Sequence, residues 1–264
     1  MLIERLRERT RTDARARAAV FDFDGTLVLI RAGWMPVMLD MMMETLRPLG
    51  PDAKVLRAEA EEYVARFTGR DTLIQMQAFA DHVHSLGGTP LAAVEYKREF
   101  ARRIRGVSQE RLDAVRTGAL VSDGVMVPGA RVLLNELRSA GVRIFLASGT
   151  AHDVVVHEAE LLGIASYFEA IHGSAPGMLG KRELLAELIR QGLSPAEIIT
   201  FGDGRVEIEA ARAIDGIAVG VATDEPACVD VDPKKRGWLR DAGADFIIPN
   251  YLEAGLLATV AGIG

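Results

Sequence analysis

Two aspartates separated by one residue, Asp22 and Asp24, are the strongest chemical signal in the sequence. They follow the apolar segment 18–20 and precede Gly25, in the string Asp-Phe-Asp-Gly-Thr. If segment 18–20 is a buried strand, a turn at Gly25 leaves both carboxylates at its carboxyl end, where open α/β sheets bind ligands. Such a pair can hold a hard cation and attack phosphorus. The alternative for this motif alone is an ordinary surface turn, since Asp and Gly favour turns.

Two further candidates lie in the second half of the chain. Ser148 follows the apolar segment 142–147, so its hydroxyl can donate to a phosphoryl oxygen while the N–H groups of Gly149 and Thr150 point into the same space. Lys181 follows a glycine at the start of a predicted helix, and its ammonium can neutralise a phosphoryl group. Taken alone, Ser-Gly-Thr is also ordinary turn material and Lys181 an ordinary solvated lysine.

A last acidic pair follows the apolar segment 198–201. Asp203 can complete an oxygen-ligand set for Mg²⁺, with Glu207 one helical turn later on the same side. Without the first motif, Asp203 would simply be a helix cap.

Composition restricts the class of protein. The chain has 264 residues, 49% of them apolar, and a net charge of −6, which predicts a sizeable core and no general attraction to nucleic acid or anionic membranes. The single cysteine, Cys228, excludes an internal disulfide framework. With no apolar stretch of about 20 residues and no signal-type start, we expect a cytoplasmic protein. Segment 1–17 is rich in arginine but interrupted by acids, which predicts a solvated leading helix.

The elements that must position these residues alternate in the manner of a doubly wound sheet. The helix that begins near Pro128 has apolar residues at spacings of three and four and stops at Gly141. We predict strands at 18–20, 142–147, 198–201, 217–221 and 246–248, and further helices at 151–162, 181–190 and 207–213.

Between residues 30 and 127, helical spacing replaces this alternation, which indicates an inserted helical domain. Candidate helices span 36–46, 53–67, 72–86, 91–104 and 108–117, and the methionines between 35 and 43 are expected to fill gaps between them.

Taken together, the motif residues resemble the four motifs of the haloacid dehalogenase (HAD) superfamily, in the right order and over nearly the full chain, and most closely its phosphoglycolate phosphatase-like group with a helical C1-type cap. This resemblance implies an α/β fold with a Rossmann-like parallel sheet core, formed by 1–29 and 128–264, and an inserted α-helical cap domain, 30–127. It also implies Mg²⁺-dependent phosphoryl transfer through an aspartyl-phosphate. The residues that carry it are Asp22, Asp24, Ser148, Lys181, Asp203 and Glu207.

On this resemblance, Asp22 attacks phosphorus, and Asp24 protonates the leaving oxygen and later accepts a proton from water. Mg²⁺ is held by Asp22, Asp203 and the main-chain carbonyl of Asp24. Glu207 stands where many relatives have Asp, so it is expected to reach the metal directly or through water. The predicted catalytic residues are Asp22, Asp24, Ser148 and Lys181, and the predicted metal ligands are Asp22, Asp24, Asp203 and Glu207.

The expected function is hydrolysis of a small phosphate monoester, a sugar phosphate or a phosphoglycolate-like acid, by a monomer or homodimer that binds neither nucleic acid nor membrane. Asp24 argues against haloalkanoate dehalogenases and phosphonate hydrolases, which lack a second aspartate there. A sugar phosphomutase shares all four motifs and stays open as the alternative. A non-catalytic phosphate-binding protein is a weaker alternative, because every catalytic position is filled.

Substrate specificity should come from side chains between cap and core. Arg31, Trp34, Arg70 and Gln75 are the candidates, together with the N–H groups of Gly149 and Thr150. An arginine can pair with a carboxylate or second phosphate, and Trp34 can stack on a sugar. Equally, Arg31 can be solvated and Trp34 can pack beneath the cap. Cap movement would use links near 29–32 and 122–127.

Overall fold

The computed structural model describes residues 3–7, 15–50, 52–68, 70–225 and 227–263. These residues form a seven-stranded sheet in the order β1-β7-β6-β5-β2-β3-β4, in which β1 pairs antiparallel with β7 and the other neighbours are parallel. The strands are β1 Glu4–Arg5, β2 Ala18–Phe21, β3 Arg143–Ala151, β4 Ala170–Ser174, β5 Ile198–Gly202, β6 Ile217–Val221 and β7 Phe246–Ile248.

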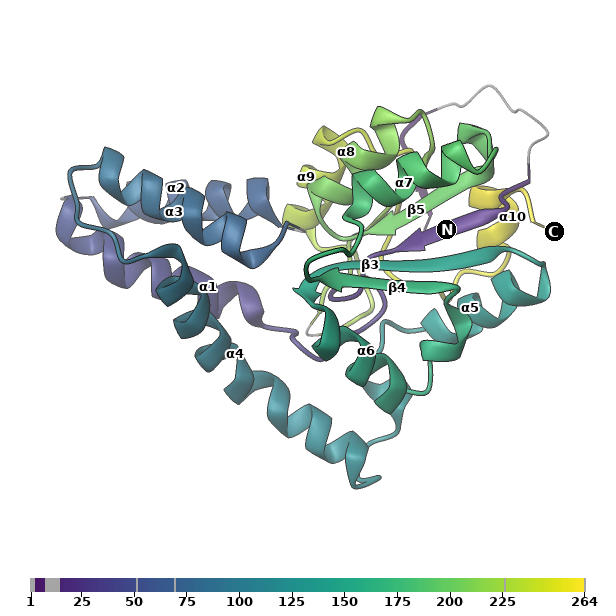
Figure 1. Ribbon diagram of the computed structural model, residues 1–264, viewed down its shortest axis with the longest axis horizontal. Coiled ribbons are helices and arrows are strands. Elements are labelled where there is room, and N and C mark those ends of the chain that lie inside the picture. Colours follow the sequence, from purple (N-terminus) through teal and green to yellow (C-terminus); the bar gives the residue numbers. More distant parts are fainter. Residues whose placement is uncertain (1–2, 8–14, 51, 69, 226, 264) are drawn as a thin grey trace.

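Helices cover both faces of this sheet, as the alternating pattern predicts. Figure 1 shows α7 and α8 on one side of the strands and α5 and α6 on the other. The helices of this part are α5 Ala130–Ser139, α6 His152–Leu161, α7 Lys181–Arg190, α8 Arg205–Ala213, α9 Pro233–Asp241 and α10 Leu256–Ala261, with 3₁₀ turns η3 Ala165–Tyr167 and η4 Pro195–Glu197.

The side chains of β2 divide the core between the two faces. Ala19 and Phe21 pack with the cluster that contains Leu133 and Leu134 of α5. Ala18 and Val20 point the other way, toward the cluster that contains the leucines of α7. Since successive strand residues face opposite sides, a strand buried on both faces must be apolar throughout, as this one is.

A helical insertion follows β2 and extends to one side of the sheet (Figure 1). Its own apolar cluster contains Met38 and Met42 packed against Met76 and Phe79, so the methionines do fill the spaces between helices. The insertion comprises α1 Trp34–Leu46, η1 Arg47–Leu49, α2 Ala53–Phe67, α3 Thr72–Ser85 and α4 Ala93–Arg116, and the 3₁₀ turn η2 Ser122–Val125 leads back to the sheet.

The structure differs from the sequence predictions in several elements, and β4, α9 and α10 were not predicted. The prediction of a leading helix is wrong for the part of it that the structure describes, because Glu4–Arg5 forms an edge strand whose residues pair with Phe246 and Ile247. Segment 8–14 of that predicted helix lies outside the described residues. The two helices predicted at 91–104 and 108–117 form the single helix α4. The expected turn at Ser148 is the end of β3, with an irregular register after Ala147.

None of the described helices combines the length and the apolar character that crossing a membrane requires.

Candidate active site

The first and last motifs meet at one edge of the sheet. β2 lies between β3 and β5, with Phe21 level with Leu146 on one side and Phe201 on the other. Asp22 follows β2, and its N–H donates to the Phe201 carbonyl at 3.0 Å. The parallel strands therefore deliver Asp22, Ser148 and Asp203 to the same carboxyl edge, as predicted.

Lys181 joins two buried carboxylates at this edge. Its Nζ lies 2.8 Å from Asp22 Oδ1 and is also paired with Glu207 Oε1. Lys181 is the first residue of α7, so the helix start aims its side chain back toward the end of β2. Burial raises the pKa of Asp22 well above its ordinary value; Lys181 opposes this, whereas the charges of Glu207 and Asp203 add to it. Burial would lower the pKa of Lys181, but the two carboxylates raise it above its usual range.

Asp203 lies directly against the turn of the first motif. Gly25 has φ of 73°, and a Cβ there would collide with the Asp203 carboxylate, so both its backbone conformation and its lack of a side chain are required. Burial raises the pKa of Asp203 to about 6, against the attraction of Lys235 and with further repulsion from nearby carboxylates.

Lys235 and Glu225 belong to this edge and were missed by the sequence analysis. Lys235 is buried, with Nζ 3.1 Å from Asp203 Oδ2 and 2.7 Å from Glu225 Oε1. Glu225 Oε2 accepts from the N–H of Gly33, just before the first helix of the insertion. Lys235 lies in the polar run at the start of α9, where nothing in the spacing distinguishes it from its solvated neighbours.

The residues at this edge fit a magnesium ion. Asp22, Asp203 and Glu207 are buried carboxylates close enough to repel one another, and Glu207 Oε2 has no hydrogen-bond partner among the described residues. Within the same residues, no three or more Asp, Glu, His or Cys side chains are arranged as a complete metal site. Mg²⁺ commonly takes only one or two protein carboxylates and fills its shell with water and phosphate oxygens, so the set suits this ion.

Asp24 is held at both carboxylate oxygens. Arg31 donates to Oδ1 at 2.7 Å, and the Thr150 hydroxyl donates to Oδ2 at 2.9 Å. Arg31 also makes two hydrogen bonds to Glu158 of α6, a buried acid that the sequence analysis did not identify. The signal available for Glu158 was its spacing from Val155 and Ala159, which puts it on the inward face of the helix.

A cavity of about 100 Å³ lies between this edge and the insertion. Three aspartates line it: Asp22, Asp24 and Asp203. Its other wall includes Trp34 and Met38 of α1 and Phe100 of α4. Trp34 also packs against the apolar cluster of the insertion. It therefore lies both at the cavity, as expected for a substrate-binding residue, and beneath the insertion, as expected for a packing residue. The cavity brings together the predicted substrate-binding residues Arg31, Trp34, Arg70, Gln75, Gly149 and Thr150.

The loop between α2 and α3 closes against the core at two glycines. A Cβ at Gly149 would lie 2.7 Å from the Arg70 carbonyl oxygen, and one at Gly204 would lie 2.9 Å from the Thr68 carbonyl oxygen. Gln75 holds this loop by donating to the Arg70 carbonyl at 2.9 Å. A second cavity, of about 650 Å³, lies on the other side of this contact and also reaches Ser148 and Lys181.

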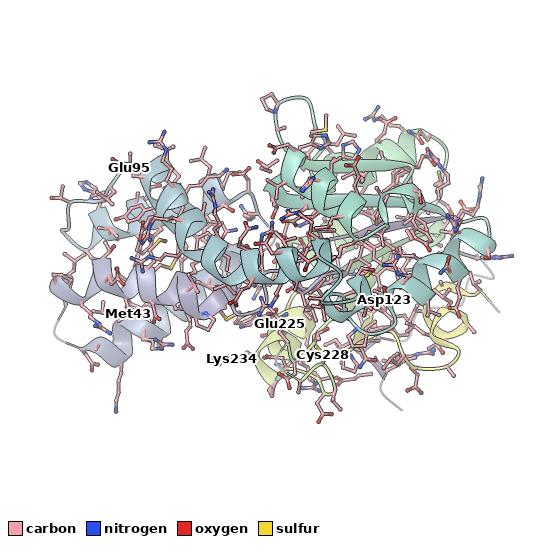
Figure 2. The ribbon with its side chains drawn as sticks, turned by 90° about the horizontal axis from the view of Figure 1, so that it is seen from below. Met43, Glu95, Asp123, Glu225, Cys228 and Lys234 are labelled. Atoms are coloured by element: carbon pink, nitrogen blue, oxygen red, sulfur yellow. The ribbon has the colours of Figure 1, made fainter. Side chains whose placement is uncertain are left out.

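Polar contacts fix the insertion over the edge. Lys234 of α9 pairs with Glu61 of α2 at 2.9 Å, and Asp71 accepts a hydrogen bond from the Ser174 hydroxyl. Figure 2 shows Glu225 and Lys234 on the side of the core that faces the insertion. The link after β2 is held from α4 by Arg111, which donates to the Ile30 and Ala32 carbonyls, both at 2.9 Å. These contacts describe a closed arrangement over Asp22.

Comparisons with known proteins give a family match and two kinds of phosphatase among the relatives. The model of the haloacid dehalogenase-like hydrolase family matches residues 16–215. The chain is 29% identical to the phosphoglycolate phosphatase of Synechococcus elongatus over 126 residues, which are 46% of this chain and 58% of that protein, so the alignment spans little more than half of this relative. It is 25% identical to the phosphoserine phosphatase of Bos taurus, over 62% of this chain and 76% of that protein.

The fold also has a solved counterpart. The crystal structure of a predicted phosphoglycolate phosphatase from Haemophilus somnus superimposes with a TM-score of 0.57 at 19% identity, covering 94% of this chain and 98% of that one. At this identity the similarity supports the architecture: a Rossmann-like α/β core with a helical insertion.

Proposed function

This chain belongs to the haloacid dehalogenase-like hydrolase family, and from that premise we propose that it is a Mg²⁺-dependent phosphatase that hydrolyses a small phosphate monoester through an aspartyl-phosphate. The observation that carries the proposal is Asp22, a buried carboxylate at the end of β2 whose Oδ1 lies 2.8 Å from the ammonium of Lys181, beside a cavity that the insertion covers.

Asp22 is the proposed nucleophile. The Lys181 ammonium favours the ionised carboxylate against the effect of burial and would offset the negative charge of an incoming phosphoryl group. Attack by a carboxylate oxygen of Asp22 on phosphorus forms the acyl phosphate and expels the alkoxide of the substrate. Water then attacks this phosphoryl group, releases phosphate and regenerates Asp22.

Mg²⁺ would be held by the carboxylates of Asp22 and Asp203 and the main-chain carbonyl of Asp24, and would supply further neutralisation of phosphoryl charge. Glu207 would complete the acidic set through a bound water, since one of its oxygens is already paired with Lys181. The buried repulsion among these carboxylates is the property that a divalent cation relieves.

Asp24 is the proposed acid and base. It lines the cavity beside Asp22, where it can protonate the leaving oxygen and later accept a proton from the attacking water. The Ser148 hydroxyl and the N–H of Gly149 are the proposed donors to phosphoryl oxygens. In the closed arrangement the Thr150 N–H donates to Ser148 Oγ at 3.1 Å and so orients that hydroxyl.

The proposed substrate is a small phosphorylated metabolite, a sugar phosphate or a phosphoglycolate-like acid. The cavity of about 100 Å³ beneath the insertion, which Asp22 and Asp24 line, suits a small organic group. Arg70 at its wall provides a cationic side chain for a carboxylate, whereas Arg31 is already paired with Asp24 and Glu158. Trp34 provides a flat face for a sugar ring. The phosphoglycolate phosphatase among the relatives supports a phosphoglycolate-like acid as the substrate.

A sugar phosphomutase is the second candidate, because the close contact of the α2–α3 loop with Gly149 and Gly204 is the kind of closure that keeps water from an acyl phosphate. The assay that separates the candidates measures free phosphate. Release from short-chain phosphorylated acids and sugars, dependent on Mg²⁺ and lost in Asp22→Asn, supports the phosphatase. Isomerisation of a sugar phosphate with little release supports the mutase. Binding without turnover on any monoester would overturn both and leave a phosphate-binding protein.

A further inference from the structure

We propose that Arg31 and Glu158 position Asp24 for its acid and base steps, Arg31 by direct contact and Glu158 by holding Arg31. Neither Glu158 nor this use of Arg31 follows from the sequence motifs. The inference rests on the proposed function, because it assigns a role to residues around the acid of that reaction.

The contact between Arg31 and Asp24 fixes the direction of the carboxylate. The guanidinium Nη1 donates to Oδ1 at 2.7 Å, while Thr150 takes Oδ2 from the opposite side. An aspartate has two rotatable side-chain bonds, and donors at both oxygens remove that freedom. Proton transfer needs the oxygen within hydrogen-bond reach of the leaving group, so a displaced carboxylate loses rate even when the fold is intact.

Glu158 fixes Arg31 in turn. Its two carboxylate oxygens accept from Nη1 at 2.9 Å and from Nη2 at 2.6 Å, and its side chain is 3% exposed. This two-point pairing orients the planar guanidinium, so that Nη1 is shared between the two acids. Because Glu158 belongs to α6 and Arg31 to the link after β2, the pair also connects the core to the start of the insertion.

The second acid gives Arg31 a counter-charge of its own. Arg31 is largely buried, with a side chain 15% exposed, and a buried guanidinium without a partner is strongly destabilising. Because Glu158 accepts from both Nη1 and Nη2, Arg31 stays paired and in place whatever contacts the Asp24 carboxylate makes with a substrate. The trio therefore keeps the donor to Asp24 at a fixed position.

The test compares phosphate esters that differ in how much they need an acid. Nitrophenolate is a stable anion and leaves without a proton, whereas the alkoxide of benzyl phosphate must be protonated as it leaves. The ratio of kcat/KM for benzyl phosphate to kcat/KM for para-nitrophenyl phosphate therefore reports on the acid, Asp24. Only the first chemical step, formation of the acyl phosphate, contributes to kcat/KM. We expect kcat/KM for benzyl phosphate to fall roughly 100-fold in Arg31→Met and in Glu158→Gln, and kcat/KM for the nitrophenyl ester to fall only about tenfold. Asp24→Asn should show the same pattern.

Arg31→Met leaves Glu158 buried without its partner and can unfold the chain, so Arg31→Met/Glu158→Gln, which removes both charges, is measured beside it. If Glu158 acts through Arg31, the double variant matches the more impaired single variant in kcat/KM on benzyl phosphate. A loss in the double variant equal to the product of the two single losses would show that Glu158 does not act through Arg31. Arg111→Met is the control, because Arg111 holds the same link through the Ile30 and Ala32 carbonyls without contacting Asp24; its effect should be equal on both esters.

Equal losses on the two esters for Arg31→Met and for the double variant, in a chain whose wild type is an active Mg²⁺-dependent phosphatase, would overturn the inference and leave the proposed function standing. A wild-type chain that releases no phosphate from either ester or from the metabolite panel would overturn the proposed function and, with it, this role for Arg31 and Glu158.

Discussion

Lys181 Nζ lies 2.8 Å from Asp22 Oδ1, and both side chains are less than a tenth exposed, at 6% and 7%. The ammonium also serves Glu207, so one cation compensates two buried carboxylates. Burial alone would favour the protonated, non-nucleophilic form of Asp22, and Lys181 is the group in the described residues that opposes burial most strongly. Stability at this edge and the reactivity proposed for Asp22 therefore depend on the same contact.

Replacing Lys181 by Met should destabilise the protein as well as inactivate it. Two buried carboxylates lose their counter-charge, and removing one partner of a buried ion pair costs about 3–5 kcal/mol. Lys234→Met is the control, since that side chain is 63% exposed in its pair with Glu61 and should cost less than about 1 kcal/mol. Urea denaturation measures both. Equal midpoints for the two variants would show that Lys181 does not compensate buried charge.

Gly25→Ala should weaken the binding of Mg²⁺ more than it weakens the fold. The substitution places a methyl group against the Asp203 carboxylate and also strains a backbone with φ of 73°. Gly118→Ala is matched in conformation, with φ of 76° and open space around the added carbon, so it carries the strain alone, about 1–2 kcal/mol. The measurement is the rise in Tm on adding Mg²⁺. We expect it to be reduced in Gly25→Ala and unchanged in Gly118→Ala; the same rise in both would contradict the placement of Asp203 in the site.

Gly149→Ala should impair closure of the insertion. Its methyl group would lie 2.7 Å from the Arg70 carbonyl oxygen, so the α2–α3 loop must move away from the core. Misplacement of this size in a closed site lowers kcat/KM by about 10- to 100-fold. Gly106→Ala, in open space on α4, is the control and should keep wild-type kinetics. Wild-type kcat/KM in Gly149→Ala would show that catalysis does not need this contact.

The edge strand β1 gives a pH-dependent contribution to stability. The hydrogen bond from Arg236 lowers the pKa of Glu4 from its ordinary 4.5, against a smaller effect of burial. A carboxylate with a lowered folded pKa stabilises the protein above its unfolded pKa, and that contribution is lost as pH falls through the folded pKa. Glu4→Gln should therefore lower Tm slightly at pH 7, and the difference should vanish below the folded pKa of Glu4. A difference in Tm between Glu4→Gln and the wild type that does not change with pH would show that the charge of Glu4 does not stabilise β1.

Much of the candidate site could be predicted because its residues follow apolar segments. Asp22 and Asp203 come directly after strands that are buried on both faces, and a run of apolar residues is a local property of the sequence. The amphipathic spacing of α5 likewise predicted its buried leucines correctly. Parallel pairing then brings the strand ends together without further information.

The remaining features depend on contacts between distant segments. Glu4–Arg5 is a strand only because Phe246 and Ile247 offer an open edge, and the arginine-rich sequence around it favours no such pairing. Lys235 is buried because Asp203 and Glu225 receive it, in a run that resembles a solvated helix face. The chain near Gly106 was predicted to separate two helices, but α4 continues through it, and Leu112 and Val115 beyond it pack against the apolar cluster of the core.

The attack of Asp22 on phosphorus is tested most directly by trapping the acyl phosphate during a single turnover, with the enzyme in excess over a monoester that it hydrolyses. Samples are quenched in acid over the course of the turnover and reduced with borohydride, which converts an acyl phosphate to the alcohol and leaves a free carboxylate unchanged. Mass spectrometry then measures the peptide that contains residue 22. If Asp22 is the nucleophile, homoserine replaces it in a fraction of the peptide that rises and falls with the turnover. Phosphate release with an unmodified peptide at every quench time would contradict the account.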